Sequence, residues 1–252
     1  MSRKRKTQKK RTLHIGRLLL VFAVFAGLCF GIYKVLTAVL HHEKTVIAVD
    51  PGFGGDATGF TGYVSESEYA EQIASRLEVL FAENRKVELV RTHDAATGMD
   101  VNQRADLIND LSPAAVLSLR ADTSADPAQS GMTIYCNVPG ERTNKESLRF
   151  AADIAEAFEA DEAYAGQVTT GYQYYRQIRQ DTYEPVFAGT DDTEKKDMNT
   201  WPLMEKCRVP VVVVTGLYVS NPDETALRTS AEAYDAAAQH YYDAIMKFAG
   251  GK

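Results

Sequence analysis

The sequence is poor in the residues that build metal centres and disulfide frameworks. Its 252 residues include 3 cysteines and 5 histidines, and they form no Cys-x-x-Cys motif or Cys/His cluster, which argues against a structural zinc site. Outside the apolar N-terminal run, Cys136 and Cys207 are equally compatible with a disulfide or with two buried free thiols. No internal repeat is visible, and no low-complexity linker occurs beyond a short hinge at 41–44. These absences leave an ordinary globular domain with an N-terminal appendage.

The appendage is a basic arm followed by one long apolar run. Residues 18–40 are long enough to cross a bilayer, which takes about 20 residues, and Lys34 near the far end can extend toward the headgroups. A cleaved signal peptide and a buried core helix are the alternatives, but no clear cleavage site follows the run. We therefore expect a single-pass anchor, with residues 1–17 cytoplasmic and residues 45–252 outside the cell. The arm lacks interleaved aromatic residues and the rest of the chain is acidic, so no nucleic-acid partner is expected.

Strands and helices alternate from residue 45 onward. Short β-rich runs separated by amphipathic segments indicate an α/β domain with one mixed, mostly parallel sheet covered by helices on both faces. A Ser65–Glu68 pair forms a capping-box signature before the first long helix. Strands are expected at 45–50, 86–91, 114–119, 132–138 and 209–216, with weaker signals at 172–178 and 183–187, and helices at 65–84, 99–111, 144–159 and 222–248.

The polar residues that could form a site lie where strands end. Asp50, Arg120 and Thr215 each follow an apolar strand, and the carboxyl ends of parallel strands meet at one edge of a sheet. Glu66, at the start of the first long helix, is expected to face the same edge, as is Phe53 in the glycine loop after Asp50. This set suits a polar ligand but is a poor catalytic set, because it contains no histidine and no paired carboxylates.

Several linked motifs resemble the zinc-dependent N-acetylmuramoyl-L-alanine amidases, which cut peptidoglycan between the sugar and the stem peptide. The similarity extends from about 45 to 252. The family pattern Asp-Pro-Gly-His-Gly-Gly corresponds to DPGFGG here, Ser-Ile-His-Ala-Asn to SLRAD, and Val-Glu-x-Gly-Phe-x-Ser-Asn to VTGLYVSN. The matching positions are 50–55, 118–122 and 214–221, with Glu66 at the family's ligand glutamate, 90–94 at its Thr-Arg-x-x-Asp element, and Arg104 at its helix arginine.

The same resemblance places changed residues at the family's reactive positions. Phe53 and Arg120 stand where the family has its two zinc histidines, Thr215 stands at the catalytic glutamate, and Glu66 alone is retained. A phenyl ring has no lone pair to donate, and a guanidinium stays protonated and repels a divalent cation. Threonine cannot act as the general base. We therefore expect neither bound zinc nor amide hydrolysis, and we expect an Arg120–Glu66 ion pair capped by Phe53. Asp122 and Asn221, with Asp50, Glu66 and Arg120, complete the candidate ligand-binding residues.

The remaining histidines and tyrosines support two further expectations. His93 and the other scattered histidines lack ligand spacing and are expected at the surface. The tyrosine-rich stretch at 164–183, with nearby Trp201, either stacks on sugar rings or covers the sheet edge. The sequence therefore predicts a membrane-anchored, catalytically inactive amidase-like domain that binds peptidoglycan or regulates cell-wall proteins. An active amidase with a rearranged site and a pure protein-interaction module are the alternatives.

Overall fold

The computed structural model describes residues 44–251, together with Gly27 and Phe30. Within these residues no helix is both long and apolar enough to cross a bilayer. Apart from Gly27 and Phe30, the predicted anchor at 18–40 lies outside the described residues.

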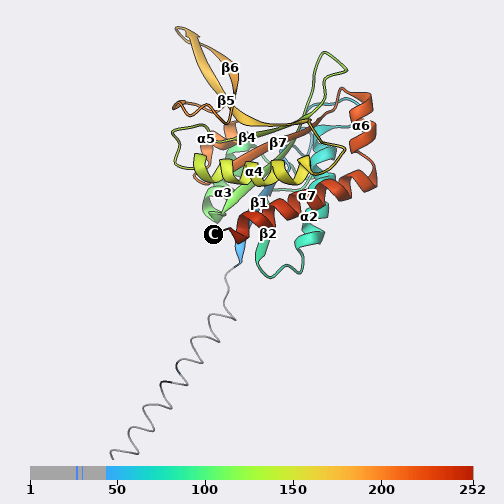
Figure 1. Ribbon diagram of the computed structural model, residues 1–252, viewed down its shortest axis with the longest axis vertical. Coiled ribbons are helices and arrows are strands. Elements are labelled where there is room, and N and C mark those ends of the chain that lie inside the picture. The colour runs from blue at the N-terminus through green and yellow to red at the C-terminus, as the bar shows by residue number, and fades with distance from the viewer. Residues whose placement is uncertain (1–26, 28–29, 31–43, 252) are drawn as a thin grey trace, which may run out of the picture. The chain divides into compact units, whose positions relative to one another are not determined.

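A seven-stranded mixed sheet forms the centre of the domain, in the order β2-β1-β3-β7-β4-β5-β6 (Figure 1). Strands β2, β1, β3 and β7 run parallel to one another, β4 is antiparallel to β7 and parallel to β5, and β6 closes an antiparallel hairpin with β5. The α/β fold expected from the alternating pattern is confirmed. The strands are β1 (Thr45–Asp50), β2 (Val87–Arg91), β3 (Ala115–Asp122), β4 (Met132–Cys136), β5 (Val168–Arg179), β6 (Thr182–Gly189) and β7 (Val211–Tyr218).

Helices cover both faces of the sheet. One face carries the larger apolar core, to which α2 (Glu66–Phe81), α4 (Asn144–Glu159) and α7 (Ala231–Gly250) contribute. The opposite face carries a smaller core, closed by α3 (Val101–Leu111) and the short α5 (Pro202–Lys206). Helix α6 (Pro222–Arg228) follows β7. The central strands are therefore buried on both sides, which explains their continuous apolar runs.

The prediction of a single helix at 222–248 is wrong in one respect, because the structure divides this segment into α6 and α7. The Ser230 side chain accepts a hydrogen bond from the amide of Ala233 at 3.1 Å and caps a new helix. Apolar periodicity alone cannot reveal this break, since the repeat continues across it. The short helix α5 was not predicted.

The two cysteines at 136 and 207 are free thiols in the structure. Cys136 is buried and donates its Sγ–H to the carbonyl of Gly171 at 3.2 Å, and burial raises its pKa to about 12. A thiol held in this state is unreactive at neutral pH.

Candidate functional site

A buried carboxylate anchors the loop that follows β1. Asp50 is inaccessible to solvent, and Arg104 Nη1 donates to its two oxygens at 2.8 and 2.7 Å. Thr92 and Ser118 each donate a hydroxyl to it, at 2.9 and 2.7 Å. Burial raises the pKa of Asp50, but the charge and hydrogen bonds of Arg104 outweigh burial and hold that pKa below its usual value. Asp50 therefore positions the loop and does not line an open site.

The loop itself passes close to Arg120. Gly52 has a φ of +78°, and a Cβ at this position would lie 2.7 Å from Arg120 Nη1. His93 contacts the loop and its neighbour through both ring nitrogens: Nδ1 lies 2.9 Å from Thr92 Oγ1, and Nε2 lies 3.4 Å from the carbonyl oxygen of Phe53. The expectation that His93 lies at the surface is wrong, because the structure buries its ring inside the turn. Burial is also the main reason that the pKa of His93 is lowered.

An ion pair occupies the centre of the site. Glu66 is the first residue of α2, and Arg120 lies near the carboxyl end of β3. Arg120 Nε lies 2.7 Å from Glu66 Oε1, with only 1% of the Glu66 side chain and 13% of the Arg120 side chain exposed. The Nε–H is not directed at the oxygen, so the contact is an ion pair and not an aligned hydrogen bond. The pair expected from the sequence is present.

Backbone amides complete the surroundings of Glu66. Phe60 N donates to Oε2 at 3.0 Å, and Ala121 N donates to Oε1 at 3.4 Å. Burial raises the pKa of Glu66, and the Arg120 charge, with these amides, offsets that effect only in part. Both carboxylate oxygens are thus engaged within the protein.

Two aromatic rings cover the guanidinium. The Arg120 Cζ atom lies 4.2 Å from the centre of the Phe53 ring and 5.6 Å from that of Trp201. These are cation–π distances. Phe53 is the cap expected from the sequence, whereas Trp201, which comes from the loop before α5, was not foreseen as a neighbour of Arg120. No sequence signal connects these two residues, because only the fold brings them together.

Two buried donors at this corner, Arg120 Nε–H and Trp201 Nε1–H, have no hydrogen-bond partner in the described part of the chain. Buried donors of this kind carry a desolvation cost that a ligand oxygen can relieve. The aromatic and cationic corner around Arg120 is therefore chemically suited to an anionic or oxygen-rich ligand.

The other predicted site residues separate into two groups. Thr215 is paired with Arg120 in the β3–β7 register, is buried, and donates its hydroxyl to the carbonyl of Thr133 at 3.5 Å. Asp122 is half-buried at the end of β3, where burial raises its pKa. Asn221 instead caps α6, accepting from the amide of Glu224 at 2.9 Å. Phe53, Glu66, Arg120 and Thr215 thus lie together, whereas Asn221 performs a local structural role.

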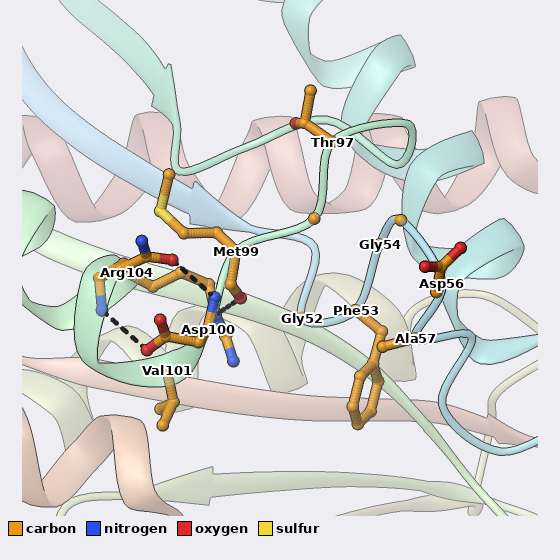
Figure 2. A pocket seen from close by; sticks show the side chains of 13 residues that line it. Gly52, Phe53, Gly54, Asp56, Ala57, Thr97, Met99, Asp100, Val101 and Arg104 are labelled. Carbon is orange, nitrogen blue, oxygen red and sulfur yellow. Dashed lines mark hydrogen bonds between the residues drawn. The ribbon is translucent and has the colours of Figure 1, made fainter.

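A pocket of about 560 Å³ lies between the glycine loop and the segment that leads into α3. Figure 2 shows the two sides, with Asp100 and Arg104 on one and Phe53 and Asp56 on the other. Asp100 is already engaged as the N-cap of α3, where it accepts from the amide of Asn102 at 2.8 Å. Among residues 44–251, no three His, Cys, Asp or Glu side chains gather as a metal ion would require.

Comparison with known proteins identifies the family. The sequence model of N-acetylmuramoyl-L-alanine amidase matches residues 47–247, whereas no curated protein sequence matches the chain. The catalytic domain of CwlV, an N-acetylmuramoyl-L-alanine amidase from Bacillus (Paenibacillus) polymyxa var. colistinus, has a similar structure, with a TM-score of 0.62 and 20% identity over 82% of this chain and 99% of that one.

Two further solved structures have the same fold. The N-acetylmuramoyl-L-alanine amidase from Clostridium difficile 630 has a TM-score of 0.66 and 14% identity, over 83% of this chain and 98% of that one. AmiC2 of Nostoc punctiforme has a TM-score of 0.61 and 17% identity, over 81% and 96% of the two chains. Because the family model spans most of the sequence, this chain belongs to the N-acetylmuramoyl-L-alanine amidase family.

Proposed function

We propose that this protein binds bacterial peptidoglycan outside the cytoplasm without hydrolysing it, and that its Arg120–Glu66 ion pair replaces the zinc centre of the family. The observation that carries the proposal is the 2.7 Å contact between Arg120 and the one retained ligand-position residue, Glu66. A guanidinium in this place supplies the positive charge that compensates the buried carboxylate. The family assignment supports peptidoglycan as the ligand.

The residues present do not fit zinc. A catalytic zinc site needs three protein ligands and an open position for water. Here Glu66 has both oxygens engaged by Arg120 and by backbone amides, and Phe53 brings only a hydrocarbon ring to the centre. Thr215 has no carboxylate to accept a proton from water. No hydrolytic step is therefore assigned to these residues.

We further propose that residues 18–40 anchor the protein in the membrane, with 1–17 in the cytoplasm and the amidase-like domain at 45–252 facing the wall. The basic arm and the apolar run of the sequence support this arrangement. Anchoring would hold the binding domain close to newly made wall, and regulation of other wall proteins is compatible with it.

The test measures binding and hydrolysis side by side. Full-length protein in detergent is incubated with purified sacculi, and pelleted protein, released stem peptides and protein-bound zinc are each quantified. A catalytically active amidase of the family serves as the positive control for release. We expect retention on sacculi, no peptide release and no stoichiometric zinc.

Each alternative has its own outcome. Peptide release together with one zinc per chain would identify an active amidase with a rearranged site and overturn the proposal. Absence of retention on sacculi would also overturn it and would favour a protein-interaction module.

A further inference from the structure

The β5–β6 hairpin displays aromatic side chains on one face. Figure 1 shows the hairpin extending beyond the rest of the domain. Tyr175, Tyr183 and Phe187 are exposed by 40, 49 and 42%. Strand register places Gln173 opposite Phe187, Tyr175 opposite Pro185, and Gln177 opposite Tyr183, so these six residues share a face. We call this set the aromatic face.

The aromatic face continues into the candidate site. The Phe187 ring lies over Gly171, where an added Cβ would come within 2.5 Å of it, and meets the Tyr135 ring edge-on at 6.1 Å. Tyr135 lies 5.2 Å from Trp201, which in turn lies 5.6 Å from the Arg120 guanidinium. The rings thus form an aromatic track from the hairpin to Arg120, in which Tyr135 is buried and supports its neighbours from within the fold.

Neighbouring backbone holds the aromatic face in position. Residues 198–200 run beside β5: Tyr175 N donates to the carbonyl of Met198 at 3.1 Å, and Thr200 N donates to that of Gln173 at 3.0 Å. These bonds occupy the edge of β5 that β4 leaves uncovered beyond Gly171, and they deliver the adjacent Trp201 to the track. The face is therefore preorganised, which reduces the entropic cost of binding.

The opposite face of the hairpin has different chemistry. Arg176 pairs with Glu184 across the two strands, and Lys196 Nζ lies 5.0 Å from the Tyr174 ring. Strand register also places Tyr174 and Val186 on this opposite face, where Tyr174 packs against the core. The exposed tyrosines of the hairpin, Tyr175 and Tyr183, both lie on the aromatic face. Exposed aromatic side chains that gather on one face are typical of an interaction surface.

We infer that the aromatic track binds a glycan strand, with an acidic substituent of that strand paired to Arg120. Aromatic rings pack on the apolar faces of sugar rings, and the amides of Gln173 and Gln177 are suited to hydrogen bonds with sugar hydroxyls. The Arg120 guanidinium, with 13% of its side chain exposed, is suited to pair with a carboxylate. The inference rests on the proposed function and names the part of peptidoglycan, its polysaccharide, that this protein contacts.

The test compares hairpin variants on a defined glycan. The variant Tyr175→Ala/Tyr183→Ala removes two exposed rings, and Arg176→Gln alters the opposite face of the same hairpin as a matched control. Full-length proteins are titrated with peptide-free glycan strands prepared from sacculi, with uncharged chitohexaose and with free stem peptide. Circular dichroism and thermal melting verify that each variant is folded.

We expect the double variant to bind peptide-free glycan strands about 30-fold more weakly than wild type, since the two rings together contribute on the order of 2 kcal/mol. The control variant should bind as wild type does. Chitohexaose should bind more weakly than the acidic strands, and Arg120→Met should remove that difference.

Equal binding of the double variant and wild type would overturn the inference, as would binding to stem peptide alone. If sacculi retain the wild-type protein and both hairpin variants bind glycan strands as tightly as wild type, the proposed function is supported and only the glycan track is refuted. Failure of wild type to bind sacculi or glycan strands would refute both. Capture of a protein partner through the rings, with no glycan binding, would overturn the inference in favour of a protein interface.

Discussion

The Arg120–Glu66 ion pair can be tested by removing its cation. Arg120→Met keeps most of the side-chain volume but leaves Glu66, of which 1% is exposed, without its counter-ion. Two backbone amides still donate to the carboxylate. Removing one partner of a buried pair typically costs about 3–5 kcal/mol, because the remaining charge stays desolvated. For a domain of this size, that loss lowers the melting temperature by roughly 10 °C.

The deficit should depend on pH in a defined direction. Burial already raises the folded-state pKa of Glu66 above its usual value, and loss of the Arg120 charge raises it further. A carboxyl whose pKa is raised on folding contributes its full stability below the unfolded pKa and loses that contribution as pH rises through the folded pKa. The variant should therefore be closest to wild type near pH 5 and most destabilised near pH 8.

Urea unfolding of wild type and variants at both pH values measures this effect. Glu66→Gln/Arg120→Met removes both charges and should recover to within about 1 kcal/mol of wild type. Arg176→Met breaks the exposed pair with Glu184 and, as the matched control, should cost less than about 1 kcal/mol. A deficit for Arg120→Met that is below about 1 kcal/mol, or that is the same at pH 5 and pH 8, would refute the reasoning.

Three further predictions concern the same strand ends. The triple variant Phe53→His/Arg120→His/Thr215→Glu should bind one zinc per chain, as measured by metal analysis. The single variant Arg120→His should bind none. A folded triple variant without zinc would contradict the assigned family positions. Asp50→Asn should cost about 3–5 kcal/mol in urea unfolding at pH 7, because its buried arginine partner loses its counter-charge. The difference in stability between wild type and the Asp50→Asn variant should shrink below about pH 4. A carboxyl of lowered pKa stabilises the fold at higher pH, and this contribution disappears as pH falls through the folded-state pKa. A difference that is independent of pH would contradict this prediction. Gly216→Ala should lower the melting temperature, because the new Cβ would meet a tyrosine hydroxyl of α2, and an unchanged melting curve would show that the tyrosine moves freely.

Local sequence patterns predicted most of the helices and strands. Helix α4 begins and ends where its periodicity predicts, and Ser65 caps α2 by accepting from the amide of Glu68 at 3.2 Å, as its spacing indicates. These features depend on residues within one turn of each other, so a sequence window contains the whole interaction. The break at Ser230 and the short helix α5 were missed, because a hydroxyl cap inside a continuing apolar repeat gives no clear signal.

Long-range contacts required the tertiary structure. The sequence assigned His93 to the surface, but the fold buries it under the glycine loop, where Thr92 and the Phe53 carbonyl contact its two nitrogens. It likewise included Asp50 and Asn221 among ligand-binding candidates, although the first is enclosed by hydrogen bonds and the second caps a helix. Residue type alone cannot distinguish a buried, satisfied carboxylate from one that faces a ligand.

By itself, the sequence determined the family resemblance and the α/β architecture, because these features reside in residue identity and short-range spacing. It also predicted that Phe53, Arg120 and Thr215 occupy the family's reactive positions. The tertiary structure decided what the changed residues do together. It brought Arg120 from β3, Glu66 from α2 and Phe53 from the glycine loop into one contact, and it joined Trp201 and the hairpin rings to them. Such contacts depend on strand register and loop path, which become fixed only when the sheet and its covering helices pack.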